Sequence, residues 1–516
     1  MATDRHPLGP KEPAAAMIPN DYNTRLRAVE TTLVELQASI SAGSTIIRQD
    51  TVEHLPSSAD RTARDAPMSL IQEIRDNITY RYHSSADDCV EDKMIEGIVS
   101  EDLTAKLLHG FTKLSSRWLF MNTNPLQLRT KSPLLYGTCL LGGLHLTPSL
   151  QGSQMHQALY RHVHGLLGQT HLSSASSLDI IQSMLILSMW DLRPTLGHEH
   201  GNSWLLSGTA SMRVMMTTSF EQLLKADNKE EEARAQELMR TWNLICLCQL
   251  QFSVGSGRPP VISGQYFDEC AKILEFSSYT ARDELVLAGV RLYRVLWGLM
   301  SSDIVQKTNA IWPEIDSLRK CQGSIYKLDS SEPLRFAYSC AYLMLARRTL
   351  KHLNHSESNK PDNLDGTFDT CAVPFIEVSV HYSIQILNLF LSMSKLTTYI
   401  HPAYENLLCS FAMVTLAEFV TYIADFSQTI LLMEQAISHI QCGGKAEPVS
   451  RWCLNIIKQH FTEHQGLTHT GIAGENRPEV LVSQSVQDSM EPWDDDEWNI
   501  EQDFPSLEDM LFGNVV

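Results

Sequence analysis

The apolar positions in the central part of the chain recur every three or four residues. A representative run is Leu103, Leu107, Phe111, Leu114 and Trp118. This spacing places the apolar side chains on one face of an α-helix, whereas the period-two alternation of a half-buried strand is rare in this chain. Because the helical pattern is sustained, we predict an all-α domain over residues 68–462.

Proline marks several of the predicted helix boundaries. Pro148, Pro194 and Pro313 each interrupt the periodic pattern, and proline is tolerated in the first turn of a helix but not in its interior. A polar segment at residues 352–370 separates two helical regions, and the pattern resumes at Val373. We therefore expect loops at these positions, with helices on either side.

The N-terminal part divides into three segments. Residues 1–20 are polar and proline-rich and are predicted to be disordered. Residues 21–42 carry a heptad repeat, which favours a coiled-coil dimerisation helix. Its a and d positions are Leu26, Val29, Leu33, Leu36 and Ile40. Because this repeat is short, a single amphipathic helix packed on its own domain is the alternative. Residues 43–67 are predicted to be a linker.

The C-terminal segment, residues 463–516, is predicted to be a disordered acidic tail. Residues 478–516 contain eleven Asp and Glu and no Lys, Arg or His, which leaves −8 of the net charge of −19 for the rest of the chain. Apolar side chains are interleaved with the acids: Trp493, Trp498, Phe504, Leu507, Met510, Leu511 and Phe512. This composition is typical of an activation segment that docks into a coactivator groove. A merely solubilising terminus is the alternative.

Composition narrows the class of protein. The chain has 516 residues, of which 43% are hydrophobic, enough for a sizeable core. Its eleven scattered cysteines favour reduced thiols in the cytosol or nucleus. The most apolar stretch, residues 407–426, includes Glu418 and Asp425 and predicts a core helix, so we expect no membrane contact. The polar N-terminus does not resemble a secretory signal.

Candidate catalytic and metal-binding residues do not form a recognisable set. Histidines gather between residues 145 and 171, but no Cys or acidic residue lies beside them at zinc-ligand spacing. Residues 198–200 (His-Glu-His) lack the paired histidines of a helical zinc protease. Cys246 and Cys248 lie in an apolar run, which predicts buried thiols. The sequence thus predicts no catalytic, metal or cofactor site, and a protein that is not an enzyme.

Residues 255–259 (Gly-Ser-Gly-Arg-Pro) invite comparison with a phosphate-binding loop. A phosphate loop follows a strand, and it needs either a third Gly that opens a helix or a Lys followed by Ser or Thr. A helical run precedes this segment, and two prolines end it. We therefore predict a turn that terminates a helix.

Two motifs carry a resemblance to a known family. The first motif spans residues 203–213 and includes Trp204, Gly208 and Arg213. The second motif leads to a Gly-Arg-Pro turn and includes Arg240, Trp242, Gly257, Arg258 and Pro259. Because of these two motifs, the chain resembles the regulatory (middle homology) domain of fungal-specific transcription factors. The resemblance covers about residues 70–460. The run TWNLICLCQLQFSVGSGRP makes it most similar to activators of secreted-protease genes. We assign the motif residues to helix packing and turn formation.

The resemblance implies an all-helical nuclear protein that activates transcription by RNA polymerase II. Such factors dimerise through a short coiled coil just after a binuclear zinc cluster, so a homodimer or a heterodimer with a related factor is expected. The implied partners are a coactivator, bound through the acidic tail, and promoter DNA, bound directly or through a partner. The implied target genes are protease genes, or metabolic and secondary-metabolite genes.

One feature of the family is missing from this sequence. The zinc cluster needs six cysteines in a short basic segment before the coiled coil, but the first cysteine here is Cys89. We therefore expect no cofactor in this chain, and zinc only if an upstream six-cysteine segment exists. Two explanations stay open: the sequence starts late, or the protein acts as a cofactor or dominant-negative partner of a zinc-cluster factor. A helical enzyme or scaffold with a solubilising tail is the alternative from another class.

Overall fold

The computed structural model describes residues 66–68, 70–71, 74, 99–119, 125–171, 177–194, 202–225, 228–302, 310–328, 331–357, 371–395, 400–442, 445–446 and 448–469. The predicted dimerisation residues, between positions 26 and 40, lie outside this part of the chain. The predicted activation residues, between positions 493 and 512, also lie outside it.

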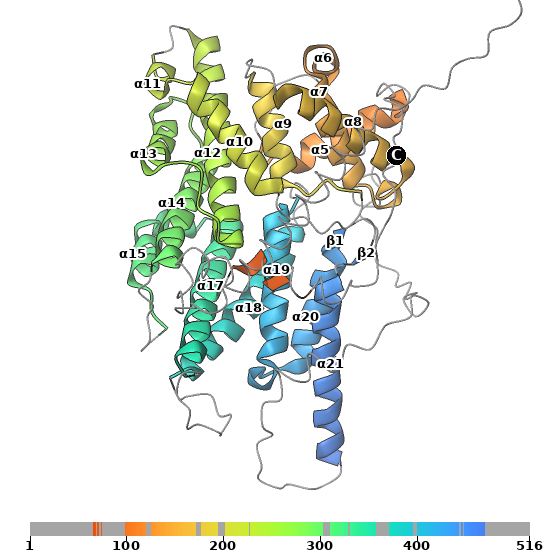
Figure 1. Cartoon of the computed structure of the whole chain (residues 1–516), viewed down its shortest axis with the longest axis vertical. Helices are drawn as coiled ribbons and strands as arrows, with labels where there is room; N and C mark the ends of the chain where they lie inside the picture. Colours follow the sequence, from red (N-terminus) through yellow and green to blue (C-terminus); the bar gives the residue numbers. More distant parts are fainter. Residues whose placement is uncertain are drawn as a thin grey trace, which may run out of the picture. The chain divides into compact units, whose positions relative to one another are not determined.

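The described part of the chain is built from helices, which confirms the predicted all-α class (Figure 1). The elements are α5 (Glu101–Ser115), α6 (Pro125–Lys131), α7 (Pro133–His145), η1 (Pro148–Leu150), α8 (Gln154–His171), α9 (Leu178–Met189), α10 (Asn202–Thr217), α11 (Phe220–Leu223), α12 (Lys229–Ser256), α13 (Gly264–Asp268), η2 (Glu269–Glu275), α14 (Ala281–Ser301), α15 (Pro313–Cys321), α16 (Gly323–Tyr326), α17 (Glu332–Glu357), α18 (Val373–Ser394), α19 (Ala403–Glu418), η4 (Val420–Tyr422), α20 (Phe426–His439), β1 (Gln441–Cys442), β2 (Lys445–Ala446) and α21 (Pro448–His469).

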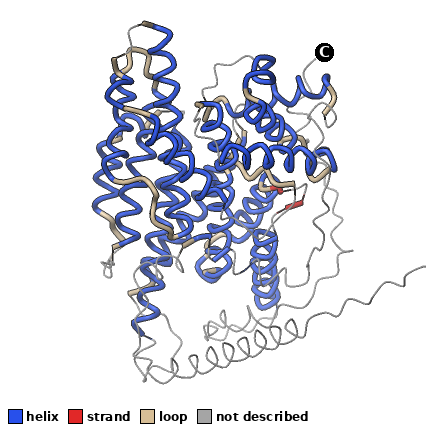
Figure 2. The backbone as a smooth tube through the Cα atoms, turned by 45° about the horizontal axis from the view of Figure 1, so that its top comes forward, coloured by secondary structure: helices blue, strands red, loops and turns tan. Residues whose placement is uncertain are grey.

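Two short elements and some helix boundaries differ from the predicted pattern. Helix α17 continues to Glu357, into the segment 352–370 that is predicted to be a loop. Strands β1 and β2 pair antiparallel, with Gln441 opposite Ala446, and stand out in red in Figure 2. With two residues each, they are too short for period-two alternation to be recognised in sequence. Helix α21 continues to His469, beyond the predicted boundary at 462.

Helices α5, α6, α8 and α9 pack around α7, and α10 packs on α9. Helix α7 contacts α5, α8 and α9, and nearly all its residues are buried. Two glycines permit the close approach of α5: a Cβ on Gly143 would lie 2.5 Å from the carbonyl oxygen of Leu107, and a Cβ on Gly142 would lie 2.5 Å from the Phe111 ring. Larger residues at these two positions would force α5 away from α7.

Helix α12 connects this group to the C-terminal helices. It contacts α9 and α10 and also α14 and α19 (Figure 1). Its N-terminus is capped by Asn228, whose side-chain oxygen accepts hydrogen bonds from the backbone N–H groups of Glu230 and Glu231 at 3.1 and 2.9 Å. It ends at Gly257, which adopts a left-handed conformation with φ of 67°. This is the helix-terminating turn that the sequence predicts.

The C-terminal helices form a second set of neighbours. Helix α17 lies along α18, and α18 contacts α19 and α20, while α21 packs on α19 and α20. Aromatic side chains fill the space between α17 and α18, where the rings of Tyr342 and Tyr382 stack with centroids 4.7 Å apart. Helix α15, which begins at Pro313, packs beside α17 and α18 through the preceding residue, Trp312. The Trp312 ring contacts the rings of Tyr342 and Phe375.

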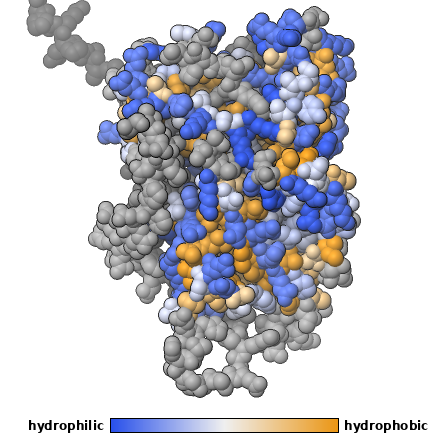
Figure 3. Space-filling view, turned by 180° about the vertical axis from the view of Figure 1, so that it is seen from behind, coloured by the Kyte–Doolittle hydropathy of each residue, from blue (hydrophilic) through white to orange (hydrophobic). Residues whose placement is uncertain are grey.

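Apolar residues are not confined to the interior. Figure 3 shows orange apolar side chains gathered among polar ones on the lower half of one face. Residues 407–418 of the most apolar stretch lie in α19, whose residues are almost all buried, including Glu405. The predicted single core helix over residues 407–426 is wrong beyond Glu418, because η4 follows and α20 begins at Phe426. Within the described residues, no helix combines the length and the apolar character that crossing a bilayer requires.

Candidate functional site

The Trp and Gly-Arg-Pro motifs meet where α10 begins and α12 ends. The indole N–H of Trp204 donates a hydrogen bond to the carbonyl oxygen of Pro259 at 3.3 Å. The guanidinium carbon of Arg258 lies 5.6 Å from the Trp204 ring centroid, within the range of a cation–π contact. Because Gly257 reverses the chain with positive φ, residues 258 and 259 return to the start of α10.

Gly208 lets α10 approach α12 closely. A Cβ at this position would lie 3.1 Å from both Gln249 Oε1 and Val261 Cγ2. The hydroxyl of the preceding residue, Ser207, donates to Gln249 Oε1 at 3.3 Å. Both the small residue and the buried glutamine therefore belong to one helix–helix contact.

Arg213, at the other end of the first motif, binds a backbone group. Its Nη2 donates a hydrogen bond to the carbonyl oxygen of Thr170 at 2.6 Å, near the end of α8. The last carbonyls of a helix lack intrahelical donors, so a cationic donor there is favourable. Arg213 thus links α10 to α8.

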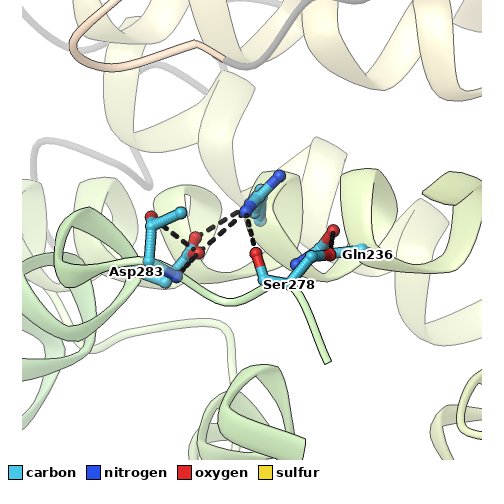
Figure 4. Close-up of polar contacts among 5 residues, drawn as sticks. Gln236, Ser278 and Asp283 are labelled. Atoms are coloured by element: carbon cyan, nitrogen blue, oxygen red, sulfur yellow. Dashed lines mark hydrogen bonds and ion pairs between the residues drawn. The ribbon is translucent and has the colours of Figure 1, made fainter. Parts of the chain in front are cut away.

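Arg240 binds a buried carboxylate. Its Nε and Nη2 donate to the two oxygens of Asp283, each at 2.9 Å, and the Asp283 side chain is only 2% exposed (Figure 4). Asp283 also accepts from the backbone N–H and the hydroxyl of Thr280, at 2.8 and 3.0 Å, as part of a capping box. Arg240 also donates to the carbonyl oxygen of Ser278 at 3.3 Å. The bidentate pair fixes the N-terminus of α14 on α12.

Trp242, two residues after Arg240 on α12, is completely buried. Its ring centroid lies 5.1 Å from that of Phe220 and 6.3 Å from that of Tyr266. The contacts join α12 to α11 and α13. The family motif residues therefore lie at helix contacts and turns between α8 and α14.

Buried cysteines lie on the same helix. Burial raises the pKa of Cys248 to about 12, and burial together with Cys270 raises the pKa of Cys246. A thiol is nucleophilic only as the thiolate. Of the nine described free cysteines whose exposure is known, Cys321 and Cys371 are exposed and the others are buried. Cys246 and Cys248 are therefore core residues.

Two of the clustered histidines lie together in the structure. Burial lowers the pKa of His145 to about 4, with a further lowering by His156 and an opposing effect of Asp191. His156 accepts from the Gly152 N–H at 3.1 Å, and its Nε2 is 3.0 Å from the Leu192 carbonyl oxygen, which fits a neutral ring. Among the described residues, no three His, Cys, Asp or Glu side chains are grouped so as to hold a metal ion.

The structure also brings together a Ser–His–Glu chain that sequence reasoning missed. The Ser394 hydroxyl lies 2.8 Å from His401 Nε2, and His401 Nδ1 lies 2.8 Å from Glu405 Oε2. The only local signal was the four-residue spacing of His401 and Glu405.

These three side chains connect two helices. Ser394 Oγ also lies 2.9 Å from the carbonyl oxygen of Phe390, and the donor in the Ser394–His401 hydrogen bond depends on the tautomer of the ring. The Phe390 ring stacks on His401 with centroids 3.8 Å apart, so these contacts join the end of α18 to the start of α19.

The helical architecture and the contacts of the motif residues agree with the class that the sequence resembles, the regulatory domain of fungal zinc-cluster factors. The comparison with known families makes this specific. Residues 97–442 match the family described as the middle domain of the transcriptional activator of proteases prtT, and the chain belongs to this family. The resemblance inferred from the two motifs is confirmed.

Curated relatives agree with this family. The transcriptional activator of proteases prtT of Penicillium rubens is 25% identical over 323 residues, which cover 61% of this chain and 50% of the relative. The Aspergillus niger protein of the same name is 27% identical over 274 residues, 51% of this chain and 43% of the relative. An uncharacterised transcriptional regulatory protein of Schizosaccharomyces pombe is 24% identical over 259 residues, 49% of this chain and 48% of the relative.

The chain spans about half the length, or less, of these three relatives. No solved structure matches the chain.

Proposed function

We propose that this protein is a nuclear transcriptional regulator that activates fungal genes, with genes for secreted proteases as the first candidates. The observation that carries the proposal is the family match over residues 97–442, together with relatives named as activators of proteases. The contacts of the motif residues support a structural rather than a catalytic role for them. In this proposal the helical domain connects the N-terminal segment, through which DNA is reached, to the acidic C-terminal segment, which activates transcription.

The output in this proposal is the acidic segment near the C-terminus. Its carboxylates repel one another and keep Trp493, Trp498, Phe504 and Phe512 available for a partner. Leu507, Met510 and Leu511 have the i, i+3, i+4 spacing of one apolar helix face. A coactivator groove lined by apolar side chains is the matching partner.

DNA is reached in one of two ways. In the first, a six-cysteine segment encoded upstream of this sequence holds two zinc ions and binds the promoter. In the second, a related DNA-bound factor recruits the chain through residues 26–40. Mass measurement of the endogenous protein distinguishes the two, because the first requires a longer protein.

The test of the output is a reporter assay with residues 463–516 fused to an unrelated DNA-binding domain. Replacing Trp493, Trp498, Phe504 and Phe512 by Ala, with every acid retained, is expected to lower reporter output by at least about tenfold, since aromatic anchors dominate such interfaces. The matched control replaces the aliphatic residues 480–482 by Ala and is expected to preserve output. Full output from the aromatic variant would instead support a solubilising tail.

A further inference from the structure

The outward face of α10 is apolar. Its side chains Leu205, Met212 and Met216 are 57%, 43% and 85% exposed. Together with the half-buried Thr209 they have the i, i+4, i+7, i+11 spacing that places side chains in one row along a helix. The buried residues of α10 pack on α9 and α12. We call the row formed by residues 205, 209, 212 and 216 the α10 stripe.

Two neighbouring features extend the α10 stripe. Gly208 brings Val261 against the helix, because a Cβ on Gly208 would lie 3.1 Å from Val261 Cγ2, and Val261 is itself 36% exposed. At the start of the helix, the guanidinium group of the exposed Arg258 lies over the half-buried ring of Trp204. Exposed apolar patches of this kind mark interaction sites, and methionine adapts its shape to a partner.

A single exposed apolar side chain is common on protein surfaces and does not have this meaning. Leu431 on α20 is an example. It is 54% exposed, but Gln428, Glu434 and Gln435, its neighbours one turn away, are polar and exposed. The α10 stripe differs because its apolar side chains follow one another along the helix.

The charge along the α10 stripe suits an acidic partner. Residues 202–217 and 257–263 contain no Asp or Glu, and Arg258 is exposed at the edge of the stripe. The chain outside residues 478–516 has a net charge of −8. An acidic segment is repelled by a surface with an excess of carboxylates, whereas these two segments do not repel it.

The C-terminal segment of the same chain has the matching composition. In residues 493–512, Trp, Phe, Leu and Met alternate with Asp and Glu, and Lys and Arg are absent. Leu507, Met510 and Leu511 have the spacing of one apolar helix face, which can lie along the row of apolar side chains on α10.

The covalent connection makes a small docking surface sufficient. Residues 470–492 connect α21 to this segment and span up to about 80 Å when extended. A compact domain of about 400 residues has a radius of gyration of about 21 Å, so this connection is long enough to reach α10. Tethering gives an effective concentration of about 1 mM, at which a contact with a Kd of about 100 µM is about nine-tenths formed.

We propose that the α10 stripe is the docking site for residues 493–512 of the same chain. The aromatic and aliphatic side chains of the segment cover Leu205, Met212 and Met216, and its carboxylates face Arg258. A docked segment cannot occupy a coactivator groove at the same time. Only this consequence rests on the proposed function, because the docking is a property of the purified chain.

The first experiment measures binding by fluorescence anisotropy, with a labelled peptide of residues 493–516 as the probe. The protein is the full chain with its own segment weakened by the replacement of Trp493, Trp498, Phe504 and Phe512 by Ala. This variant is expected to bind the peptide with a Kd of about 100 µM, which tethering then makes sufficient.

Substitutions on the body of this protein locate the site. Met212→Glu combined with Met216→Glu is expected to weaken peptide binding by at least about tenfold, because apolar contacts are lost and the new carboxylates repel the acidic peptide. Leu431→Glu makes the same kind of change at the exposed position on α20 and is expected to leave binding unchanged. All three side chains are exposed, so these variants are expected to fold.

The second experiment measures docking within the unlabelled parent chain. Dilute hydrogen peroxide converts exposed methionine to its sulfoxide, and mass spectrometry follows each residue. Met216 is expected to be oxidised at least about threefold more slowly in the parent than in the variant with the four aromatic replacements. Met155, half-buried on α8, is expected to be oxidised equally in both. The protection is expected to persist on roughly hundredfold dilution, since a tethered contact does not depend on protein concentration.

Four results would overturn the proposal. The first is the absence of peptide binding up to about 1 mM, the effective concentration of the tethered segment. The second is equal loss of binding in Leu431→Glu and in the double methionine variant. The third is equal oxidation of Met216 in parent and variant: fast oxidation in both means that the stripe is uncovered, and slow oxidation in both means that another occupant covers it. The fourth is protection that disappears on dilution, which would assign the stripe to a second copy of the chain.

Discussion

At the residue scale, the contact between Arg240 and Asp283 joins positions 43 residues apart. Arg240 stands in a motif, but nothing in the sequence pattern marks Asp283 as its partner. A helical period predicts which side chains face inward, and it carries no information on which distant helix they meet. The Ser394–His401 contact could not be predicted from the sequence for the same reason.

The first prediction concerns this ion pair. Arg240→Ala is expected to lower the free energy of unfolding by about 3 kcal/mol, because the buried carboxylate of Asp283 then loses its guanidinium partner. Urea denaturation measures the change. Arg234 forms an exposed ion pair with Glu230 on the same helix, and Arg234→Ala is expected to cost less than about 0.5 kcal/mol. Similar losses in the two variants would contradict a stabilising role of burial.

The second prediction concerns acid stability and His145. Its pKa is about 4 in the folded protein and near 6.5 in an unfolded chain. As the pH falls between these values, the unfolded state takes up the proton first, so the free energy of unfolding decreases, by at most about 3 kcal/mol from this group. His145→Leu abolishes this contribution and is expected to flatten the pH dependence of urea denaturation between pH 6.5 and 4.

The control for this experiment is His109→Leu on α5, which removes an exposed histidine. Its pH dependence is expected to follow that of the parent. An unchanged slope in His145→Leu would show that His145 takes up its proton equally readily in the folded and the unfolded protein.

At the scale of elements, the sequence predicted most of what local chemistry determines. Helix α15 begins at Pro313 and α18 at Val373, as the proline and polar-loop signals indicate. The end of α12 at Gly257 was also predicted, because two glycines and two prolines follow an apolar helical run. The end of α21 was misplaced, because the residues near 462 contain no strong helix-terminating signal such as proline.

The third prediction concerns the predicted helix at residues 21–42. Leu33→Glu places a charge in the proposed heptad seam and is expected to convert a dimer of the full chain to monomers in sedimentation equilibrium. Val34→Glu makes the same change at the adjacent outward position of the heptad and is expected to leave the dimer intact. A monomeric parent, or dimers in both variants, would favour a helix packed on its own domain.

At the scale of the whole molecule, the described helices share one hydrophobic core. Among the described residues, one cluster of buried side chains includes members from Met68 to Ile457 on α21. The charge is distributed differently, since residues 478–516 hold eleven acids and no basic residue.

The burial of the cysteines has a chemical consequence. A thiol with a pKa of about 12, such as Cys139 or Cys248, is ionised in roughly one molecule in a hundred thousand at neutral pH. Peroxide and alkylating reagents are therefore expected to react very slowly with the buried cysteines. Among the cysteines whose exposure the structure describes, they are expected to react first with the exposed Cys321 and Cys371. These two positions, at the end of α15 and just before α18, are ready-made attachment points for a fluorescent dye. A dye there would follow movements of the domain without any engineered cysteine.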